Sequence, residues 1–395
     1  MKLFFRVFFS CLFASSTTFV SHAQDNESAG NYTVIKETVI SDVLSESRNV
    51  VVQLPKSYAA NPSKKFPIIY RLDGAGNLVM MNAVLESLQS QGAAPEVIIV
   101  AIENTERLRD LYPTVNNDPN GPVGYGGGGE KFLSFITNEL MPMVEGKYRV
   151  HDFRIIAGAS AAGVFSLYAL QKQPELFDAA LSYSAAVWWA YGATGKSTVE
   201  FLKNTPKLHH YIYTAIGNEG APMRAFYDEM IDGIKTHQPE GLRWVNDSFS
   251  NVPHNLVSTA ARFRAYHNLF YSEVMPVQHF DGTVESIEAY YQEVSAQRGQ
   301  SMEAQEWVIR NLGYHFVNQR ELARAIMLFK YGVKRYPDVP DAHNGLAYGY
   351  EQAGQLEDAL IEVNKAIALA NEEYQGYQVY LDRRERLLTQ LSKKS

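Results

Sequence analysis

The stretch FRIIAGASAAGVFSLYALQKQ, residues 153–173, decides the fold. It begins as an apolar run typical of a buried strand and continues, after Ser160, with the small and apolar residues of a packed helix. A strand that turns directly into a helix at Gly-x-Ser-x-Gly is a nucleophile elbow, which lifts a serine hydroxyl above the edge of a sheet. Gly158 and Ser160 fit this pattern, whereas Ala162 stands where the second glycine is expected. The stretch predicts either a catalytic Ser160 or a small residue in a tight turn.

Segments on both sides of this turn alternate between strand and helix patterns. Strands are expected at 33–58 (an antiparallel pair), 64–74, 96–104, 178–185 and 209–217, and helices at 131–148 and 221–237. Strands that alternate with helices predict an α/β fold, in which a mostly parallel central sheet is covered on both faces.

The chain beyond about residue 295 has no strand-like run and contains a repeat. Residues 312–333 align without gaps on residues 346–367, an offset of 34 residues. This period is typical of tetratricopeptide repeats, which are helix pairs that stack on their neighbours. Two unrelated amphipathic helix pairs are the alternative. We expect a small all-α tetratricopeptide-like module at 301–390, packed on the preceding domain because two repeats alone bury little core.

The first 23 residues have the features of a secretory signal peptide. Lys2 and Arg6 precede a short apolar run, and Ser21-His22-Ala23 resembles a cleavage site. An uncleaved membrane anchor is the alternative, although Ser and Thr interrupt the run. Cleavage after Ala23 predicts export across the inner membrane to the periplasm. No later segment is long and apolar enough for a membrane span in the mature chain.

Composition excludes several classes of function. Cys11 is the only cysteine and would leave with the signal peptide, so we expect neither disulfides nor thiol chemistry in the mature chain. The net charge of −7 becomes −9 when Lys2 and Arg6 are removed, which argues against a nucleic-acid partner. Metal-ligand spacing is not evident, so no metal and no cofactor are expected.

The ordered segments resemble the esterase group of the α/β-hydrolase superfamily that includes ferric enterobactin esterase and other bacterial siderophore esterases. The resemblance runs from about residue 33 to about residue 271. It rests on SESRNVVVQLPKSY (45–58), FPIIYRLDG (66–74), ENTERLRDLYP (103–113), GGGEKFLSFITNELMPMVEGKYRV (127–150) and PELFDAALSYSAAVWW (174–189). It implies an α/β-hydrolase fold over the domain at 30–295 and the hydrolysis of carboxylic esters.

A nucleophilic serine needs a base, and the acid that orients this base should lie between serine and histidine in the chain. His254, in a loop before the final helix of the domain, resembles the histidine of the group's His-x-x-Val loop; a solvated loop histidine is the alternative. Glu219, after an expected strand, is the preferred acid. Asp228 and Asp247 are alternatives. The resemblance also allows a Ser–His dyad without an acid, because some members of this esterase group work with such a dyad.

An oxyanion hole needs two backbone N–H groups. We expect one from Ala161 and the other from the turn at Gly74 or Ala75. Trp188 and Trp189 follow an expected strand and either wall a substrate pocket or serve as buried packing.

These residues predict an exported serine ester hydrolase that forms an acyl-enzyme with a small-molecule ester, of the siderophore, acyl-sugar or feruloyl type. The alternative is a hydrolase fold retained as a binding or scaffold protein, whose repeats recruit a protein partner. Ala159, Ala162 and Ala185, which depart from the group's pattern, favour the alternative, and the retention of Ser160 and His254 favours the enzyme.

Overall fold

The computed structural model describes residues 27–29, 32–60, 62, 64–91, 93–271, 274–298 and 302–393. The expected signal peptide therefore lies outside the described residues.

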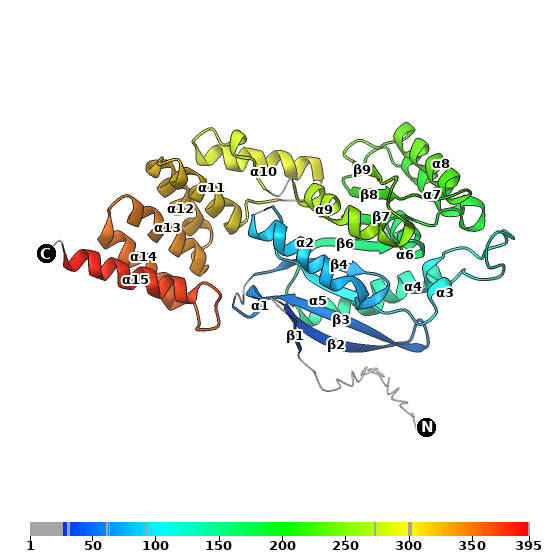
Figure 1. Cartoon of the computed structure of the whole chain (residues 1–395), viewed down its shortest axis with the longest axis horizontal. Coiled ribbons are helices and arrows are strands. Elements are labelled where there is room, and N and C mark those ends of the chain that lie inside the picture. The colour runs from blue at the N-terminus through cyan, green and yellow to red at the C-terminus, as the bar shows by residue number, and fades with distance from the viewer. Residues whose placement is uncertain are drawn as a thin grey trace, which may run out of the picture.

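A nine-stranded sheet forms the centre of the molecule, with the strand order β1-β2-β3-β5-β4-β6-β7-β8-β9 (Figure 1). The strands are β1 Glu27–Ala29, β2 Tyr32–Ser41, β3 Glu46–Pro55, β4 Phe66–Arg71, β5 Ile98–Ile102, β6 Val150–Ala159, β7 Ala179–Tyr183, β8 Tyr211–Ile216 and β9 Arg243–Ser248. The first three strands are antiparallel, and β3 pairs antiparallel with β5. From β5 to β9 in the spatial order all neighbours are parallel. The predicted mostly parallel α/β-hydrolase sheet is confirmed.

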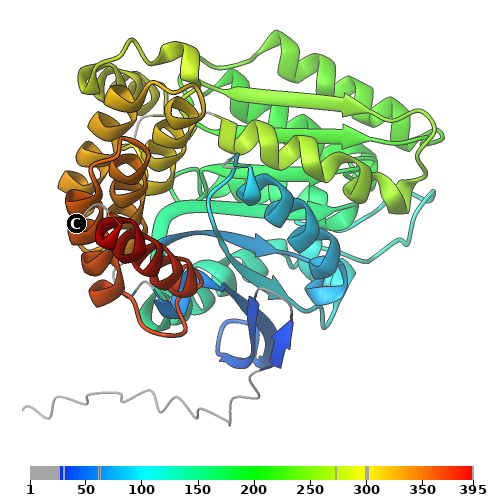
Figure 2. The same ribbon diagram turned by 60° about the vertical axis from the view of Figure 1, so that its left-hand side comes forward.

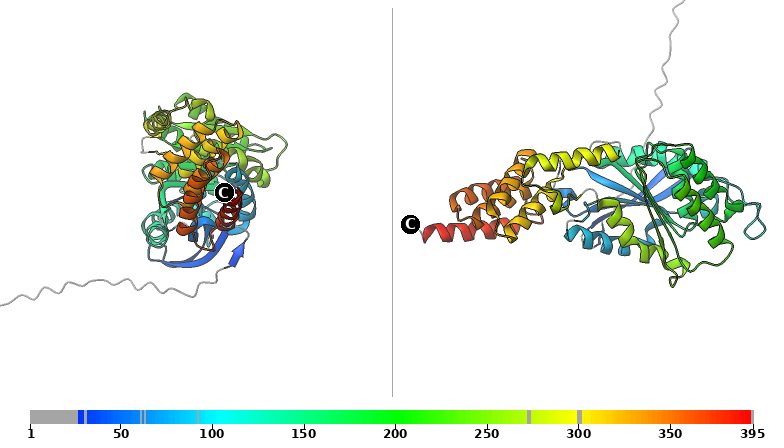
Figure 3. Two further views of the ribbon diagram at one scale, coloured as in Figure 1. Left: turned by 90° about the vertical axis from the view of Figure 1, so that its left-hand side faces the viewer. Right: turned by 90° about the horizontal axis from the view of Figure 1, so that it is seen from above.

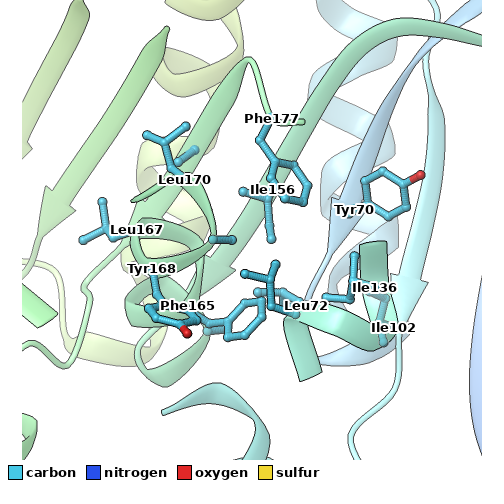
Figure 4. Close-up of a cluster of buried hydrophobic side chains, with 14 of the residues drawn as sticks. Tyr70, Leu72, Ile102, Ile136, Ile156, Phe165, Leu167, Tyr168, Leu170 and Phe177 are labelled. Carbon is cyan, nitrogen blue, oxygen red and sulfur yellow. The ribbon is translucent and has the colours of Figure 1, made fainter. Parts of the chain in front are cut away.

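Helices cover both faces of this sheet because its central strands are apolar on both sides. The helices of this part are α1 Ser57–Ala60, α2 Leu78–Ser90, α3 Arg107–Leu111, α4 Gly129–Phe135, α5 Met141–Lys147, α6 Ala161–Lys172, α7 Trp189–Lys203, α8 Met223–Thr236, α9 Val257–Phe270 and α10 Val284–Arg298. Apolar side chains of α2 and α9 pack on one face of the sheet, and those of α4 to α8 pack on the other. Figure 4 shows part of the second layer, where Phe165 and Leu170 of α6 lie near Ile156 of β6 and Tyr70 of β4.

The C-terminal helices repeat with the period expected from the sequence. They are α11 Glu306–Asn318, α12 Leu322–Arg335, α13 Pro340–Gln352, α14 Leu356–Leu369 and α15 Tyr377–Ser392. The bounds of α13 and α14 are those of α11 and α12 displaced by 34 residues. Glycines on α11 and α13 make room for Phe329 of α12, because a Cβ at Gly313 would lie 2.4 Å from its ring. The assignment to the tetratricopeptide family stays a prediction.

These five helices stand beside the sheet and extend away from it (Figures 2 and 3). Ala60 of α1 packs against the apolar cluster that α13, α14 and α15 share. Since α1 precedes β4, this contact lies near the amino end of a parallel strand. The opposite edge of the sheet, at the carboxyl ends, stays clear of the C-terminal helices.

Candidate active site

The carboxyl ends of parallel strands meet at one edge of a sheet, and the predicted site residues follow those ends. Ser160 comes directly after β6, Glu219 follows β8, and His254 follows β9. The turn at Gly74, where an oxyanion hole is expected, follows β4. Topology alone therefore brings residues that are far apart in the sequence to the same edge.

Ser160 occupies a strained backbone position at the junction of β6 and α6. Its φ of 59° and ψ of −119° lie outside the regions that non-glycine residues commonly adopt. Three backbone hydrogen bonds hold it there: its N–H donates to the Tyr183 carbonyl at 2.9 Å, and its carbonyl accepts from Val164 N–H at 3.1 Å and from Ala186 N–H at 3.2 Å. This is the geometry of a nucleophile elbow.

The elbow requires glycine at position 158 and accepts alanine at position 162. A Cβ on Gly158 would lie 2.4 Å from the carbonyl oxygen of Ala162 and 2.5 Å from its Cβ. Ala162 is fully buried. Its methyl group fits because Gly158 has no side chain, so the departure from Gly-x-Ser-x-Gly leaves the turn intact.

Glu219 and His254 form a hydrogen-bonded pair. Nδ1 of His254 lies 2.8 Å from Oε1 of Glu219, so a proton on Nδ1 is donated to the carboxylate. The Glu219 side chain is 8% exposed, whereas that of His254 is 41% exposed. This bond leaves Nε2 of the imidazole available for another partner, which is the arrangement that a general base requires.

Ser184, for which no sequence pattern indicated a function, also binds Glu219. Its hydroxyl donates to Oε1 of Glu219 at 2.6 Å, and its N–H donates to the Ala215 carbonyl at 2.7 Å. Ser184 is buried and has a φ of 42°. The only signal in the sequence is its position immediately after β7, because the contact with Glu219 depends on the neighbouring strand β8.

The two alternative acids have other partners. Asp247 accepts from the Tyr213 hydroxyl at 2.6 Å and from Nε of Arg264 at 2.7 Å. Asp228 lies on α8, where Arg224 donates to it at 3.0 Å. Among the predicted acids, the structure brings Glu219 to His254.

The expected oxyanion turn is fixed by a network around Asp73. Asp73 and Gly74 have φ values of 64° and 66°. Arg107 donates to both carboxylate oxygens of Asp73, at 2.7 and 2.9 Å, and Asn104 donates at 2.7 Å. Burial alone would raise the pKa of Asp73, but the Arg107 hydrogen bond and charge outweigh it and lower the pKa. The carboxylate is therefore ionised, which favours a fixed turn.

Arg107 also connects this turn to the elbow, since its Nη2 lies 3.5 Å from the Ala159 carbonyl, one residue before Ser160. Ala161 is the first residue of α6, and its N–H therefore lacks an acceptor within the helix. Ala75 lies in the 3₁₀ turn Gly74–Asn77.

The two tryptophans have different surroundings. Trp189 is 3% exposed, stacks on Tyr112 with ring centroids 3.7 Å apart, and donates from Nε1 to the Thr114 carbonyl at 2.9 Å. It packs the segment after α3 against α7 rather than lining a pocket. Trp188 is partly exposed and lies against Gly121.

Within the residues that the structure describes, no group of three His, Cys, Asp or Glu side chains could hold a metal ion. Among those same residues, no helix has the length and apolar character needed to cross a bilayer.

Comparison with known proteins identifies the family of this chain. The profile of the family described as "Putative esterase" matches residues 41–231. The uncharacterized protein YbbA of Bacillus subtilis is 30% identical over 204 residues, which span 50% of this chain and 80% of YbbA. The chain belongs to this esterase family. It is a carboxylic ester hydrolase, and the resemblance noted in the sequence is confirmed.

Two further proteins resemble this esterase. Ferri-bacillibactin esterase BesA of Bacillus subtilis is 27% identical over 250 residues, spanning 55% of this chain and 86% of BesA. The crystal structure of an IroE-like serine hydrolase from Shewanella oneidensis superposes with a TM-score of 0.68 and 25% identity. That alignment covers 77% of this chain and 99% of the other.

Proposed function

We propose that the protein is an exported serine esterase in which Ser160, His254 and Glu219 act as nucleophile, base and orienting acid. The observation that carries this proposal is the hydrogen bond between Nδ1 of His254 and the largely buried Glu219 carboxylate. This hydrogen bond lies at the sheet edge where the strained Ser160 directly precedes α6.

The reaction follows from these roles. Nε2 of His254 takes the proton of the Ser160 hydroxyl as its oxygen attacks the ester carbonyl carbon. The resulting oxyanion accepts hydrogen bonds from Ala161 N–H and from the turn at Gly74 or Ala75. His254 then returns the proton to the departing alkoxide, which leaves an acyl-enzyme on Ser160. Water, deprotonated by His254, attacks the acyl carbon, the bond to Ser160 Oγ breaks as His254 returns the proton to that oxygen, and the acid is released.

The substrate class that has most support is the siderophore ester. Ferri-bacillibactin esterase, and the siderophore triacetylfusarinine C esterase of Aspergillus fumigatus, are relatives whose names state such substrates. Acyl-sugar and feruloyl-type esters are the other classes. Half-exposed Trp188 is the tryptophan that remains available to contact an acyl or aryl group. Export rests on the first 23 residues, and N-terminal sequencing of the exported protein should begin at Gln24.

A fluorophosphonate probe tests the nucleophile. The mature protein should be labelled at Ser160, and Ser160→Ala should abolish both labelling and the hydrolysis of aryl esters and ferric catechol siderophores. Ser166→Ala is the matched control, because Ser166 is a buried serine of the same helix whose hydroxyl donates to the Ala162 carbonyl. A folded wild-type protein that neither labels nor hydrolyses any of these esters would favour the binding or scaffold function instead.

A further inference from the structure

Two arginine side chains are buried behind the oxyanion turn, and the proposed reaction uses neither of them. Arg71 is the last residue of β4 and is 4% exposed, and Arg262 on α9 is 1% exposed. A guanidinium stays charged in proteins, so its burial is costly unless anionic or polar groups surround it. The surroundings of the two side chains therefore call for a physical explanation.

Strand register shows how β4, β6 and β7 make room for these groups. Arg71 pairs with Ala157 on β6, and Ala159, two residues further on the same face, pairs with Tyr183 on β7. Between Arg71 and Tyr183 the register places the small side chains of Ala157 and Ala159. Helix α9 covers this face beside α2, as Figure 1 shows, and contributes Arg262.

The donors in this space exceed the acceptors. Nη1 of Arg71 donates to the Leu72 carbonyl. Nε and Nη1 of Arg262 and the hydroxyl of Tyr183 are buried without a hydrogen-bond partner among the described residues. Tyr266, one turn after Arg262, is 1% exposed, and burial raises the pKa of its hydroxyl, which keeps it neutral. The tyrosines therefore supply neutral hydroxyls and no counter-charge.

The charge of this space is also unbalanced. Burial lowers the pKa of Arg71, the Asp73 carboxylate opposes that shift, and the Arg262 charge adds to it. Both oxygens of Asp73 already accept from Arg107, and one of them from Asn104 as well. The Asp73 carboxylate thus interacts with the charges of Arg107 and Arg71, and Arg262 adds a further positive charge near Arg71, so these groups together carry an excess of positive charge.

We propose that Arg71, Arg262 and the Tyr183 hydroxyl bind a small inorganic anion of the halide class, represented by chloride, behind the oxyanion turn. Guanidinium and hydroxyl groups are donors that suit such an ion, and one negative charge offsets part of the excess. Each of these side chains is at most 4% exposed, so the space favours a monatomic anion over a phosphate or a large carboxylate. The anion would couple β4 and β7 to α9 and stabilise the folded state.

Thermal unfolding of the mature full-length protein tests this site, with chloride replacing gluconate at constant ionic strength. Each tenfold rise in chloride above the dissociation constant should stabilise the protein by about 1.4 kcal/mol, which raises the melting temperature of a chain of this length by roughly 2 °C. Arg262→Met should abolish this response. Arg264→Met is the matched control and should keep it, because Arg264 lies on the same helix but is 57% exposed and pairs with Asp247.

A crystal of the wild-type protein grown in bromide gives a second readout. It tests for a bound anion even if Arg262→Met does not fold. An anomalous peak between the Arg71 and Arg262 side chains is expected. If the melting temperature is the same in chloride and in gluconate and no bromide peak is found, water alone hydrates these donors. That result would overturn the proposal. Ser160→Ala should keep the chloride response, so the anion site and the esterase can fail independently.

Discussion

Replacing Gly158 with alanine tests whether packing within the elbow controls the position of Ser160. The new Cβ would lie 2.4 Å from the Ala162 carbonyl oxygen, whereas ordinary contacts begin at 3.4 Å. Residues 158 and 162 must therefore separate by about 1 Å, and Ser160 lies between them. Overpacking of this kind costs about 1–3 kcal/mol of stability, which lowers the melting temperature of a chain of this length by roughly 1–4 °C. A displacement of about 1 Å in a catalytic group can reduce turnover by ~10²-fold.

The assay compares kcat/KM on an activated aryl ester with the melting temperature. Gly146→Ala is the control, because a Cβ there would meet nothing within 4 Å and alanine is favoured within helix α5. Gly158→Ala combined with Ala162→Gly removes the Cβ contact but leaves the carbonyl contact at 2.4 Å, so it should not restore activity. Wild-type kcat/KM and melting temperature in Gly158→Ala would refute the reasoning.

Three further predictions concern hydrogen-bonded side chains. Glu219→Gln should lower kcat by roughly 10²–10⁴-fold with an unchanged melting temperature, while Asp247→Asn should leave kcat near the wild-type value. Ser184→Ala removes a hydrogen bond to the Glu219 carboxylate and should lower kcat roughly tenfold with little change in KM, as stopped-flow or steady-state assays would measure. The His343–Glu362 pair should stabilise the protein at pH 5.5 relative to pH 8.5, measured by thermal unfolding of wild type against His343→Gln.

The sign of the last prediction follows from the surroundings of His343. Burial alone would lower its pKa, but hydrogen bonds to the Glu362 carboxylate at 2.7 Å and the Pro337 carbonyl at 2.8 Å outweigh it and raise the pKa above 6.5. This stabilisation is complete below pH 6.5 and disappears as the pH rises through the pKa of the folded state. The pKa of Glu362 is lowered from 4.5, so the contribution of the carboxylate is complete above that pH.

Each of these predictions has an outcome that contradicts it. Equal kcat for Glu219→Gln and wild type would indicate a Ser–His dyad. A rise in KM with unchanged kcat for Ser184→Ala would mean that the residue contacts substrate rather than orienting Glu219. Equal pH dependence of wild type and His343→Gln would show that the pair adds nothing to stability.

Apolar strands were the part of the fold that the sequence predicted well. The runs at 64–74 and 96–104 became β4 and β5, whose residues are all buried, and the antiparallel pair at 33–58 became β2 and β3. Strand β9, Arg243–Ser248, was not predicted, because Trp244 and Val245 are its only apolar residues and no residue of this edge strand is fully buried. The break in α7, where Ala190 and Tyr191 have positive φ, was not predicted either, because alanine and tyrosine rarely adopt positive φ.

The site could be predicted only as far as chain order allows. The order of serine, acid and histidine permitted Glu219, Asp228 and Asp247 alike. The three acids differ in their hydrogen-bond partners. Asp247 accepts from Arg264 and Tyr213, and Asp228 accepts from Arg224. Chain order does not reveal these side-chain contacts. The contact of Ser184 with Glu219 was missed for the same reason.

The 34-residue displacement of α13 and α14 from α11 and α12 makes the C-terminal part extensible. A further copy of such a helix pair could be inserted between α12 and α13. It would pack on both neighbours through the same kind of contact that α12 and α13 now make with each other. The chain would grow longer as a rod while the esterase domain, attached through its amino-terminal edge, kept its geometry. The number of C-terminal helix pairs can therefore change by duplication without any change in the residues around Ser160.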